Sequence, residues 1–158
     1  MLNIYLDLDG VIHKTLPLQQ YEEGGCFSWV ELIHEDSQVF IQKLKKFGRV
    51  NVLSKTFFPS SDERHYHQEQ DKIKKCLELG FKPSEIIILP ADANKAIFSS
   101  PTSILIDDYG ENCRRWQAGG GLAIQFNEIK NKAWITCLTY NEVLHKIKKI
   151  SQKETLWL

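Results

Sequence analysis

Two aspartates stand two positions apart at the end of an apolar run near the start of the chain. Residues 4–11 read IYLDLDGV, so Asp7 and Asp9 precede a glycine. Side chains alternate between the two faces of a β-strand, and both carboxylates therefore leave the strand pointing the same way. Two carboxylates held together repel unless a cation or a proton offsets their charge. The pair indicates a site for a metal ion and a nucleophile.

Three further segments carry residues of matching chemistry in a fixed order. The apolar run ILIDD ends in the paired carboxylates Asp107 and Asp108, and the run VNVLS ends in the hydroxyl of Ser54. Lys95 lies between these two runs, twelve positions before Asp107. An Asp-x-Asp pair alone also occurs in solvated turns. Four segments in the order Asp-x-Asp-Gly, Ser, Lys, Asp-Asp are much more specific.

Length, charge and cysteine usage limit the classes of protein to consider. The 158 residues fit one domain, residues 1–150, with a C-terminal tail, residues 151–158. Twenty basic and twenty acidic residues balance, so no global basic field indicates nucleic acid, although a local patch stays open. No apolar run suits a signal peptide or a membrane span, and the four cysteines form no Cys-x-x-Cys. We expect a cytoplasmic protein with reduced thiols and no membrane partner.

The order of apolar strand-like runs and helical patterns predicts an α/β fold. We expect a three-layer, Rossmann-like parallel sheet with helices on both faces. The expected strands cover residues 3–8, 50–53, 85–89, 103–106, 122–126 and 133–137. The expected helices run from a capping box at Ser28 to Gly48, over residues 70–79, through Trp116, and from Thr139 through Ile150. Ligands bind outside the carboxyl ends of the strands in such sheets, so the polar strand ends should converge there.

These motifs resemble those of the haloacid dehalogenase-like (HAD) hydrolase superfamily, over roughly residues 3–126. Residues 7–11 (DLDGV) look like its first motif, Ser54 its second, Lys95 its third and residues 106–108 (IDD) its fourth. The stretch ILIDDYGEN, followed by Trp116 and two glycines, is particularly similar to the 5'(3')-deoxyribonucleotidases and to the phosphatase domains of polynucleotide kinase-phosphatases. Most members of the superfamily are phosphatases that work through an aspartyl-phosphate.

The resemblance implies a role for each catalytic side chain. Asp7 would attack phosphorus, and Asp9 would protonate the leaving oxygen and then take a proton from water. Ser54, Lys95 and Gly10 would bind the phosphoryl group. A protonated Asp9 near pH 6 requires a pKa well above the reference value of about 3.9. Lys55, Lys72, Lys74 and Lys75 also lie near these motifs in the sequence and are alternative candidates for the third-motif lysine.

The resemblance also implies a Mg²⁺ ion, held by the carboxylate of Asp7, the backbone carbonyl of Asp9 and one aspartate of the 107/108 pair. Two unit charges 4 Å apart interact by about 4 kcal/mol at an effective dielectric of 20. Several carboxylates facing a phosphate therefore need a hard divalent cation. The sequence does not decide whether Asp107 or Asp108 is the direct ligand, and we favour Asp107. If this interpretation is right, Asp7 must lie close to both.

The chain has little room for the cap domain with which this superfamily sets specificity. Some 17 residues, 12–28, follow the first motif, and residues 56–70 form a similarly short segment. We expect a minimal cap, which departs from the deoxyribonucleotidases and leaves their substrates in doubt. A site without a lid admits large substrates, so we expect a polymer end or a phosphoprotein besides a small phosphorylated molecule, unless oligomerisation supplies a lid. Candidate specificity residues are His13, Lys14, Tyr21, Glu22, Glu23 and residues 57–67.

Other interpretations of the same residues remain in competition. A non-catalytic phosphate-binding or regulatory module with this fold is the alternative function. His65 and His67 lack a third ligand at matching spacing, so a zinc site is disfavoured. Trp116 and Trp134 are interpreted as core residues. Contact of Arg114–Arg115 with a second charge on a substrate is the disfavoured alternative, so this pair is not assigned to the site.

Overall fold

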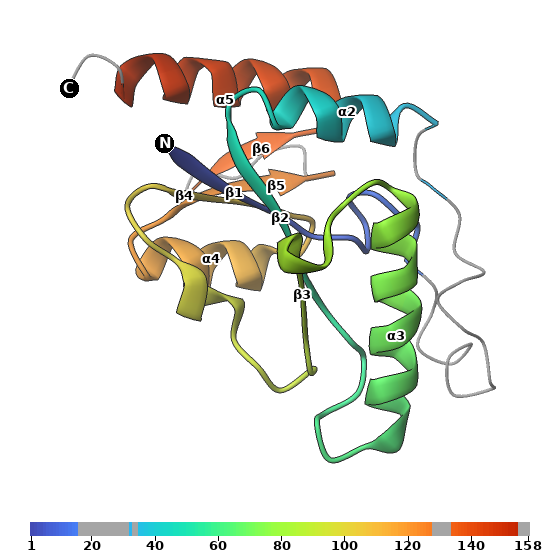
Figure 1. Ribbon diagram of the computed structural model, residues 1–158. Coiled ribbons are helices and arrows are strands. Elements are labelled where there is room, and N and C mark those ends of the chain that lie inside the picture. The colour runs from blue at the N-terminus through green and yellow to red at the C-terminus, as the bar shows by residue number, and fades with distance from the viewer. Residues whose placement is uncertain (16–31, 33–34, 128–133, 155–158) are drawn as a thin grey trace.

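Six parallel strands form the centre of the protein in this computed structural model, which describes residues 1–15, 32, 35–127 and 134–154 (Figure 1). Their order across the sheet is β3-β2-β1-β4-β5-β6. The strands are β1 (Leu2–Leu6), β2 (Gly48–Lys55), β3 (Ile86–Leu89), β4 (Ser103–Asp107), β5 (Leu122–Phe126) and β6 (Ile135–Cys137). This order is that of a Rossmann-like doubly wound sheet, so the predicted fold class is confirmed.

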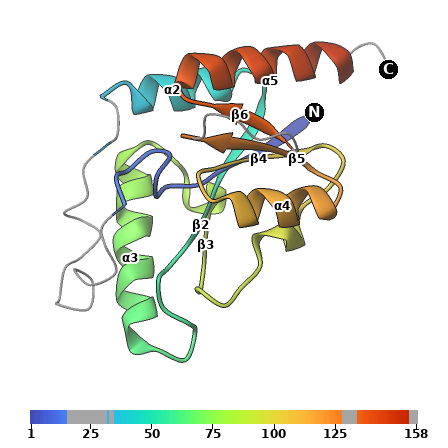
Figure 2. The same ribbon diagram turned by 180° about the vertical axis from the view of Figure 1, so that it is seen from behind.

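Helices cover both faces of the sheet (Figures 1 and 2). They are α2 (Ser37–Leu44), α3 (Glu63–Glu78), α4 (Gly110–Ala118) and α5 (Tyr140–Glu154), with short 3-10 helices η2 (Pro83–Glu85) and η3 (Lys95–Phe98). Buried side chains of α2, α3 and α5 share one core cluster, and those of α4 belong to a second cluster. Within the described residues no second domain is inserted, in keeping with the expected minimal cap.

The two core clusters follow from the alternation of side chains along the strands. Ile4 and Leu6 of β1 are fully buried in the cluster that includes Phe40 of α2. Tyr5, between them, points to the other face, where its ring meets that of Trp116 at 5.1 Å between centroids. Near-continuous apolar strands are expected where a parallel sheet is buried on both faces. Trp116 is fully buried, as the sequence predicted.

Several predicted boundaries differ from the observed ones. The capping box at Ser28 lies outside the described residues. Helix α3 begins at Glu63 rather than near residue 70, because the Asp62 side chain accepts a hydrogen bond from the Arg64 N–H (2.9 Å) and caps the helix. Helix α5 continues to Glu154, past the predicted domain boundary at residue 150. No helix of the described residues is long and apolar enough to cross a membrane.

Tyr140, the first residue of α5, fixes the loop that follows β1. Its hydroxyl donates to the backbone carbonyl of Val11 (2.7 Å). The same hydroxyl lies 3.0 Å from the Oγ of Ser37, which is the first residue of α2. Its ring stacks on Phe40, with 4.0 Å between centroids. One side chain therefore joins two helices to the loop that carries Asp9 and the glycine after it.

Tyr140→Phe is expected to lower the free energy of unfolding by about 1–2 kcal/mol, because the buried Val11 carbonyl loses its donor while the packing of the ring is kept. Urea titration followed by circular dichroism measures this loss. Tyr66→Phe is the matched control, since Tyr66 is 59% exposed. Equal stability of the two variants would contradict the role assigned to the Tyr140 hydroxyl.

Candidate active site

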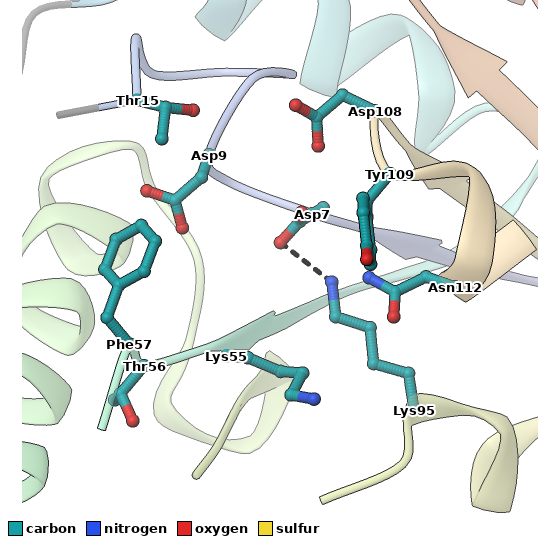
Figure 3. Close-up of a pocket in the computed structure, with 10 residues that line it drawn as sticks. All are labelled: Asp7, Asp9, Thr15, Lys55, Thr56, Phe57, Lys95, Asp108, Tyr109 and Asn112. Atoms are coloured by element: carbon teal, nitrogen blue, oxygen red, sulfur yellow. Dashed lines mark ion pairs between the residues drawn. The ribbon is translucent and has the colours of Figure 1, made fainter. Parts of the chain in front are cut away.

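A cavity of about 270 Å³ opens at the carboxyl edge of the sheet (Figure 3). Its lining combines carboxylates, lysines, hydroxyls and two aromatic rings. The lining residues are Asp7, Asp9, Thr15, Lys55, Thr56, Phe57, Lys95, Asp108, Tyr109 and Asn112. Residues from all four sequence motifs lie at or beside this cavity.

Strand register explains why distant segments meet here. Strand β1 lies between β2 and β4, and its last residue, Leu6, pairs with Val52 on one side and Ile106 on the other. The Asp7 N–H continues this ladder by donating to the Ile106 carbonyl (2.9 Å). The chain winds in opposite directions from β1 and β4, and a crevice forms outside the strand ends at such a switch point. The expected convergence of the polar strand ends is confirmed.

Lys95 is the cation that lies between the first and fourth motifs. Its buried Nζ is 2.9 Å from Asp7 Oδ1 and 2.7 Å from Asp107 Oδ2. Burial alone lowers the pKa of Lys95, but the Asp107 and Asp7 carboxylates outweigh burial and raise the pKa above its usual value. The Asn94 side chain accepts a hydrogen bond from the Ala96 N–H (3.0 Å) and caps η3, which positions Lys95.

Asp107 and Asp108 have different surroundings. Asp107 is fully buried, and both of its carboxylate oxygens accept hydrogen bonds, from Lys95 Nζ, the Tyr109 N–H (2.9 Å) and Asn112 Nδ2 (3.1 and 3.2 Å). Asp108 lines the cavity, and its carboxylate has no hydrogen-bond partner among the described residues. Burial, followed by the charges of Asp7 and Asp107, raises the pKa of Asp108 to about 8. The geometry thus favours Asp108, not Asp107, as the residue open to a ligand.

Gly10 allows the Asp108 carboxylate to approach the loop after β1. Gly10 has a φ of +72°, and a Cβ at this position would lie 1.9 Å from Asp108 Oδ2. The Gly10 N–H donates to the His13 carbonyl (2.7 Å). Because this donor is already used within the turn, its hydrogen bonding does not support the predicted phosphate-binding role. The glycine is needed instead for its backbone conformation and for the absence of a side chain.

Asp9 faces β2 and α3. Its Oδ2 is 3.4 Å from Ser54 Oγ and accepts a hydrogen bond from Lys72 Nζ, while its Oδ1 is buried without a hydrogen bond to the described residues. Burial raises the pKa of Asp9, the Lys72 ammonium opposes this shift, and the Asp7 carboxylate adds to it. The direction of the shift is the one that a proton donor near neutral pH requires.

Lys72 is a buried cation at this site that the sequence analysis did not assign. It was one of several lysines near the motifs in the sequence. A signal was nevertheless present, because the buried residues of α3 recur at helical spacing: His65, Gln68, Lys72 and Cys76. A lysine at a core position of such a stripe indicates a buried partner.

Of the predicted specificity residues, Lys14 and residues 58–67 do not line the cavity. Tyr21, Glu22 and Glu23 lie outside the described residues. His13 is buried and does not line the cavity, so it is not placed to meet a substrate, and burial followed by Lys75 and Lys72 lowers its pKa to about 4. Phe57 does line the cavity, on the side opposite Tyr109 (Figure 3).

The histidines considered for zinc lie on helix α3, where His65 has a structural contact. Its Nδ1 is 2.8 Å from the Thr56 Oγ1, which also donates to the Phe58 carbonyl (2.9 Å). In the described part of the chain, neither His65 nor His67 belongs to a cluster of three or more candidate metal ligands.

Asp7, Asp107 and Asp108 form such a cluster, with one oxygen atom from each carboxylate within 4.8 Å of the others. This spacing bears out the expectation that Asp7 lies close to both residues of the pair. A hard cation takes oxygen ligands of this kind, and Mg²⁺ in particular is bound through one or two carboxylates while it keeps several waters. The donor set therefore fits Mg²⁺.

A scan against protein-family models finds no match, and a search of curated proteins finds none either. Solved structures do match. A D,D-heptose 1,7-bisphosphate phosphatase from Burkholderia thailandensis is 14% identical, with a TM-score of 0.61 over 94% of this chain and 99% of that one. A HAD hydrolase, family IA, variant 3, from Entamoeba histolytica HM-1:IMSS is 12% identical, with a TM-score of 0.62 over 96% of this chain and 100% of that one.

The fold is that of the HAD hydrolases. A second D,D-heptose 1,7-bisphosphate phosphatase, from B. bronchiseptica and complexed with magnesium and phosphate, is 13% identical, with a TM-score of 0.56 over 94% of this chain and 99% of that one. At these identities the likeness establishes the fold, and the similarity predicted from the motifs is confirmed at that level. The nucleotidase-like branch stays a prediction.

Asp108→Asn is expected to stabilise the metal-free protein. The raised pKa means that the folded state keeps a proton on Asp108 between about pH 4 and pH 8 that the unfolded chain releases, so stability falls as the pH rises through this window. Asparagine removes this penalty, so the Tm in EDTA should rise more at pH 8 than at pH 4.

The same variant should lose the thermal stabilisation that Mg²⁺ gives to the unaltered protein, since binding to the folded state alone raises stability. Differential scanning fluorimetry with EDTA and with Mg²⁺ measures both effects, and Asp71→Asn on α3 is the matched control. Equal stabilisation of Asp108→Asn and the unaltered protein by Mg²⁺ would exclude Asp108 as a ligand.

Proposed function

We propose that this protein is a Mg²⁺-dependent phosphatase that hydrolyses phosphate monoesters through an aspartyl-phosphate on Asp7. The observation that supports it most is the clustering of charged side chains at the carboxyl edge of the sheet. These are Asp7, Lys95, Asp107 and Asp108, with Asp9 and Ser54 beside them. The fold supports it further, since structures with this fold include two phosphatases.

In the first step, an Asp7 oxygen attacks phosphorus as the bond to the leaving oxygen breaks, and Asp9 gives its proton to that oxygen. In the second step, Asp9 takes a proton from a water molecule, whose oxygen attacks the phosphorus of the aspartyl-phosphate. Inorganic phosphate leaves and the Asp7 carboxylate is restored. Two displacements replace one difficult step in this way.

The remaining residues bind and orient the phosphoryl group. Lys95 holds Asp7 Oδ1, which leaves the other Asp7 oxygen for attack and places positive charge beside the phosphoryl oxygens. Ser54 lies on the Asp9 side, where its hydroxyl can donate to a phosphoryl oxygen. These groups act from a largely buried site, in which charged donors stabilise developing negative charge more strongly than they do in water.

Mg²⁺ would be held by the carboxylates of Asp7 and Asp108, with the Asp9 backbone carbonyl as a further ligand, and it would neutralise negative charge on the transferring phosphoryl group. Asp107 would then position Lys95 rather than contact the ion, because its oxygens are occupied by hydrogen bonds. This assignment reverses the preference for Asp107 drawn from the sequence.

A nucleotide or a phosphorylated polynucleotide end is the substrate we favour. The side chains of Phe57 and Tyr109 lie on opposite sides of the cavity (Figure 3), and Tyr109 is 62% exposed. Aromatic rings placed in this way can stack on a base. The Lys55 side chain also lines the cavity and adds positive charge at its rim (Figure 3). The fourth-motif stretch supports the same substrate class.

Asp7→Asn is expected to reduce turnover of p-nitrophenyl phosphate by about 10³-fold or more, since it removes the nucleophile. EDTA should have a comparable effect on the unaltered protein, reversed by Mg²⁺, and Asp71→Asn should keep full activity. Absence of turnover by the unaltered protein on nucleotides, sugar phosphates, phosphopeptides and 3'-phosphate oligonucleotides would instead favour a phosphate-binding module.

The pH dependence of turnover tests the role of Asp9. Its raised pKa keeps a fraction of Asp9 protonated at higher pH than usual, and this fraction falls as the pH rises. We therefore expect an activity optimum below about pH 7.5. A pH–rate profile that still rises at pH 9 would exclude Asp9 as the proton donor.

Tyr109→Ala is expected to raise the KM for a deoxynucleoside monophosphate by about tenfold, because stacking of a base on an aromatic ring contributes about 1–3 kcal/mol. The KM for β-glycerophosphate, which has no ring, should stay unchanged and serves as the internal control. Steady-state kinetics with both substrates measures the difference. An equal rise for both would refute base stacking on Tyr109.

A further inference from the structure

Lys72, in the middle of α3, is fully buried. A buried ammonium loses its hydration, which costs free energy unless hydrogen bonds and opposite charge compensate for it. Lys74, two positions further along the same helix, is exposed. Burial of a lysine is therefore not a general property of this helix and needs a local explanation.

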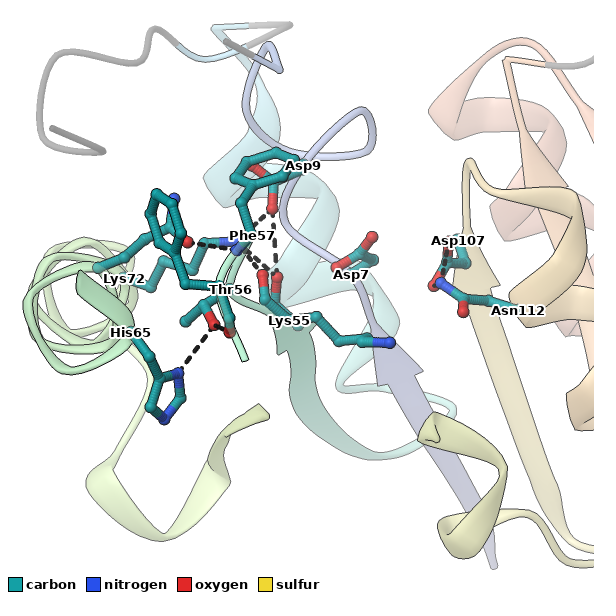
Figure 4. A network of polar contacts seen from close by, with 12 residues as sticks. Asp7, Asp9, Lys55, Thr56, Phe57, His65, Lys72, Asp107 and Asn112 are labelled. Carbon is teal, nitrogen blue, oxygen red and sulfur yellow. Dashed lines mark hydrogen bonds and ion pairs between the residues drawn. The ribbon is translucent and has the colours of Figure 1, made fainter. Parts of the chain in front are cut away.

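The Lys72 ammonium has a partner for each of its three protons. It donates to Asp9 Oδ2, to Ser54 Oγ (3.1 Å) and to the backbone carbonyl of Lys55 (2.6 Å). These three partners belong to the loop after β1 and to the end of β2. Figure 4 shows Lys72 reaching from α3 to this point, beside the ring of Phe57.

These contacts fix the orientation of the Ser54 hydroxyl and of the Asp9 carboxyl group. Because Ser54 Oγ accepts a hydrogen bond from the Lys72 ammonium, its own O–H is directed elsewhere, toward Asp9 or toward a bound phosphoryl oxygen. Asp9 is held by one oxygen, Oδ2, while its Oδ1 makes no hydrogen bond to the described residues. Asp9 Oδ1 is buried, and it is the carboxyl oxygen whose hydrogen-bonding capacity the described residues leave unused.

We propose that Lys72 is a positioning residue that orients the Asp9 carboxyl group for the proton-transfer steps and the Ser54 hydroxyl for binding of the phosphoryl group. This inference rests on the proposed phosphatase function. The two buried lysines then have separate tasks. Lys95 holds the nucleophile Asp7 and the fourth motif, and Lys72 holds the acid–base group and the second motif.

Lys72→Met tests this assignment, because methionine has similar length and no charge. The variant is compared on two esters, p-nitrophenyl phosphate with a good leaving group and β-glycerophosphate with a poor alkoxide leaving group. Departure of the alkoxide depends more on the proton from Asp9 than departure of p-nitrophenolate does. General acid–base catalysis contributes about 10²–10⁴-fold, so kcat for β-glycerophosphate should fall at least about tenfold, with a smaller fall for p-nitrophenyl phosphate and little change in KM.

Lys74→Met is the matched control and should keep both rates. An equal loss of kcat on the two esters would overturn the proposal, because a general disturbance of the fold does not discriminate between leaving groups. Loss through KM alone would overturn it as well.

A double-mutant cycle with Asp9→Asn gives a second test. If Lys72 acts through Asp9, adding Lys72→Met to Asp9→Asn should have little further effect on kcat for β-glycerophosphate. A further large fall would overturn the proposal. The double variant also removes both charges of the buried pair, so it remains informative if Lys72→Met alone does not fold.

Crystal structures of the unaltered protein and of a Lys72 variant separate this inference from the proposed function. We expect the Asp9 and Ser54 side chains to rotate away from their present positions when Lys72 is replaced. Unmoved side chains would overturn the proposal, even if the unaltered protein hydrolyses neither ester. Failure of the unaltered protein to hydrolyse any phosphate ester would count against the phosphatase function alone.

Discussion

The balance of charge at the ends of β1 and β4 is the constraint on which the site depends. Asp7, Asp9, Asp107 and Asp108 crowd together where water is largely excluded, and their mutual repulsion opposes folding. Two buried ammonium groups offset part of this charge. The remaining negative charge faces the cavity at Asp108. A divalent cation bound there would compensate for it.

The hydrophobic core makes this concentration of charge possible. The parallel strands are covered on both faces, and the alternation along β1 places Ile4 and Leu6 on one side and Tyr5 on the other. The polar residues then follow where the strands end. Tyr140 adds a buried contact to the Val11 carbonyl, so the loop after β1 is held against the helices rather than by the carboxylates alone.

Helix α3 contributes to both fold and site. Cys76 packs into the main core, whereas Lys72, one turn earlier, meets Asp9 and Ser54. At the N-terminal end of the helix, the Gln68 side chain accepts from the Phe57 N–H (2.6 Å), and His65 contacts Thr56. The rim of the cavity is thus built on a regular element, which limits the movement of Phe57.

The sequence alone predicted the fold class, the approximate location of the strands, and the four aspartates and Lys95 that meet at the strand ends, but not Lys72. This was possible because apolar runs and their polar ends are local patterns in the sequence. The carboxyl ends of parallel strands meet at one edge of the sheet, so the polar residues that follow the strands were expected to lie together. Boundaries that depend on a single cap, such as Asp62 before α3, were less accessible. The tertiary structure decided which partner each charge has: that Lys95 pairs with Asp7 and Asp107, that Asp108 faces the cavity, and that Lys72 is buried against Asp9. These pairings depend on contacts between residues 12 to 88 positions apart, for which side-chain direction and burial, rather than residue type, set the outcome.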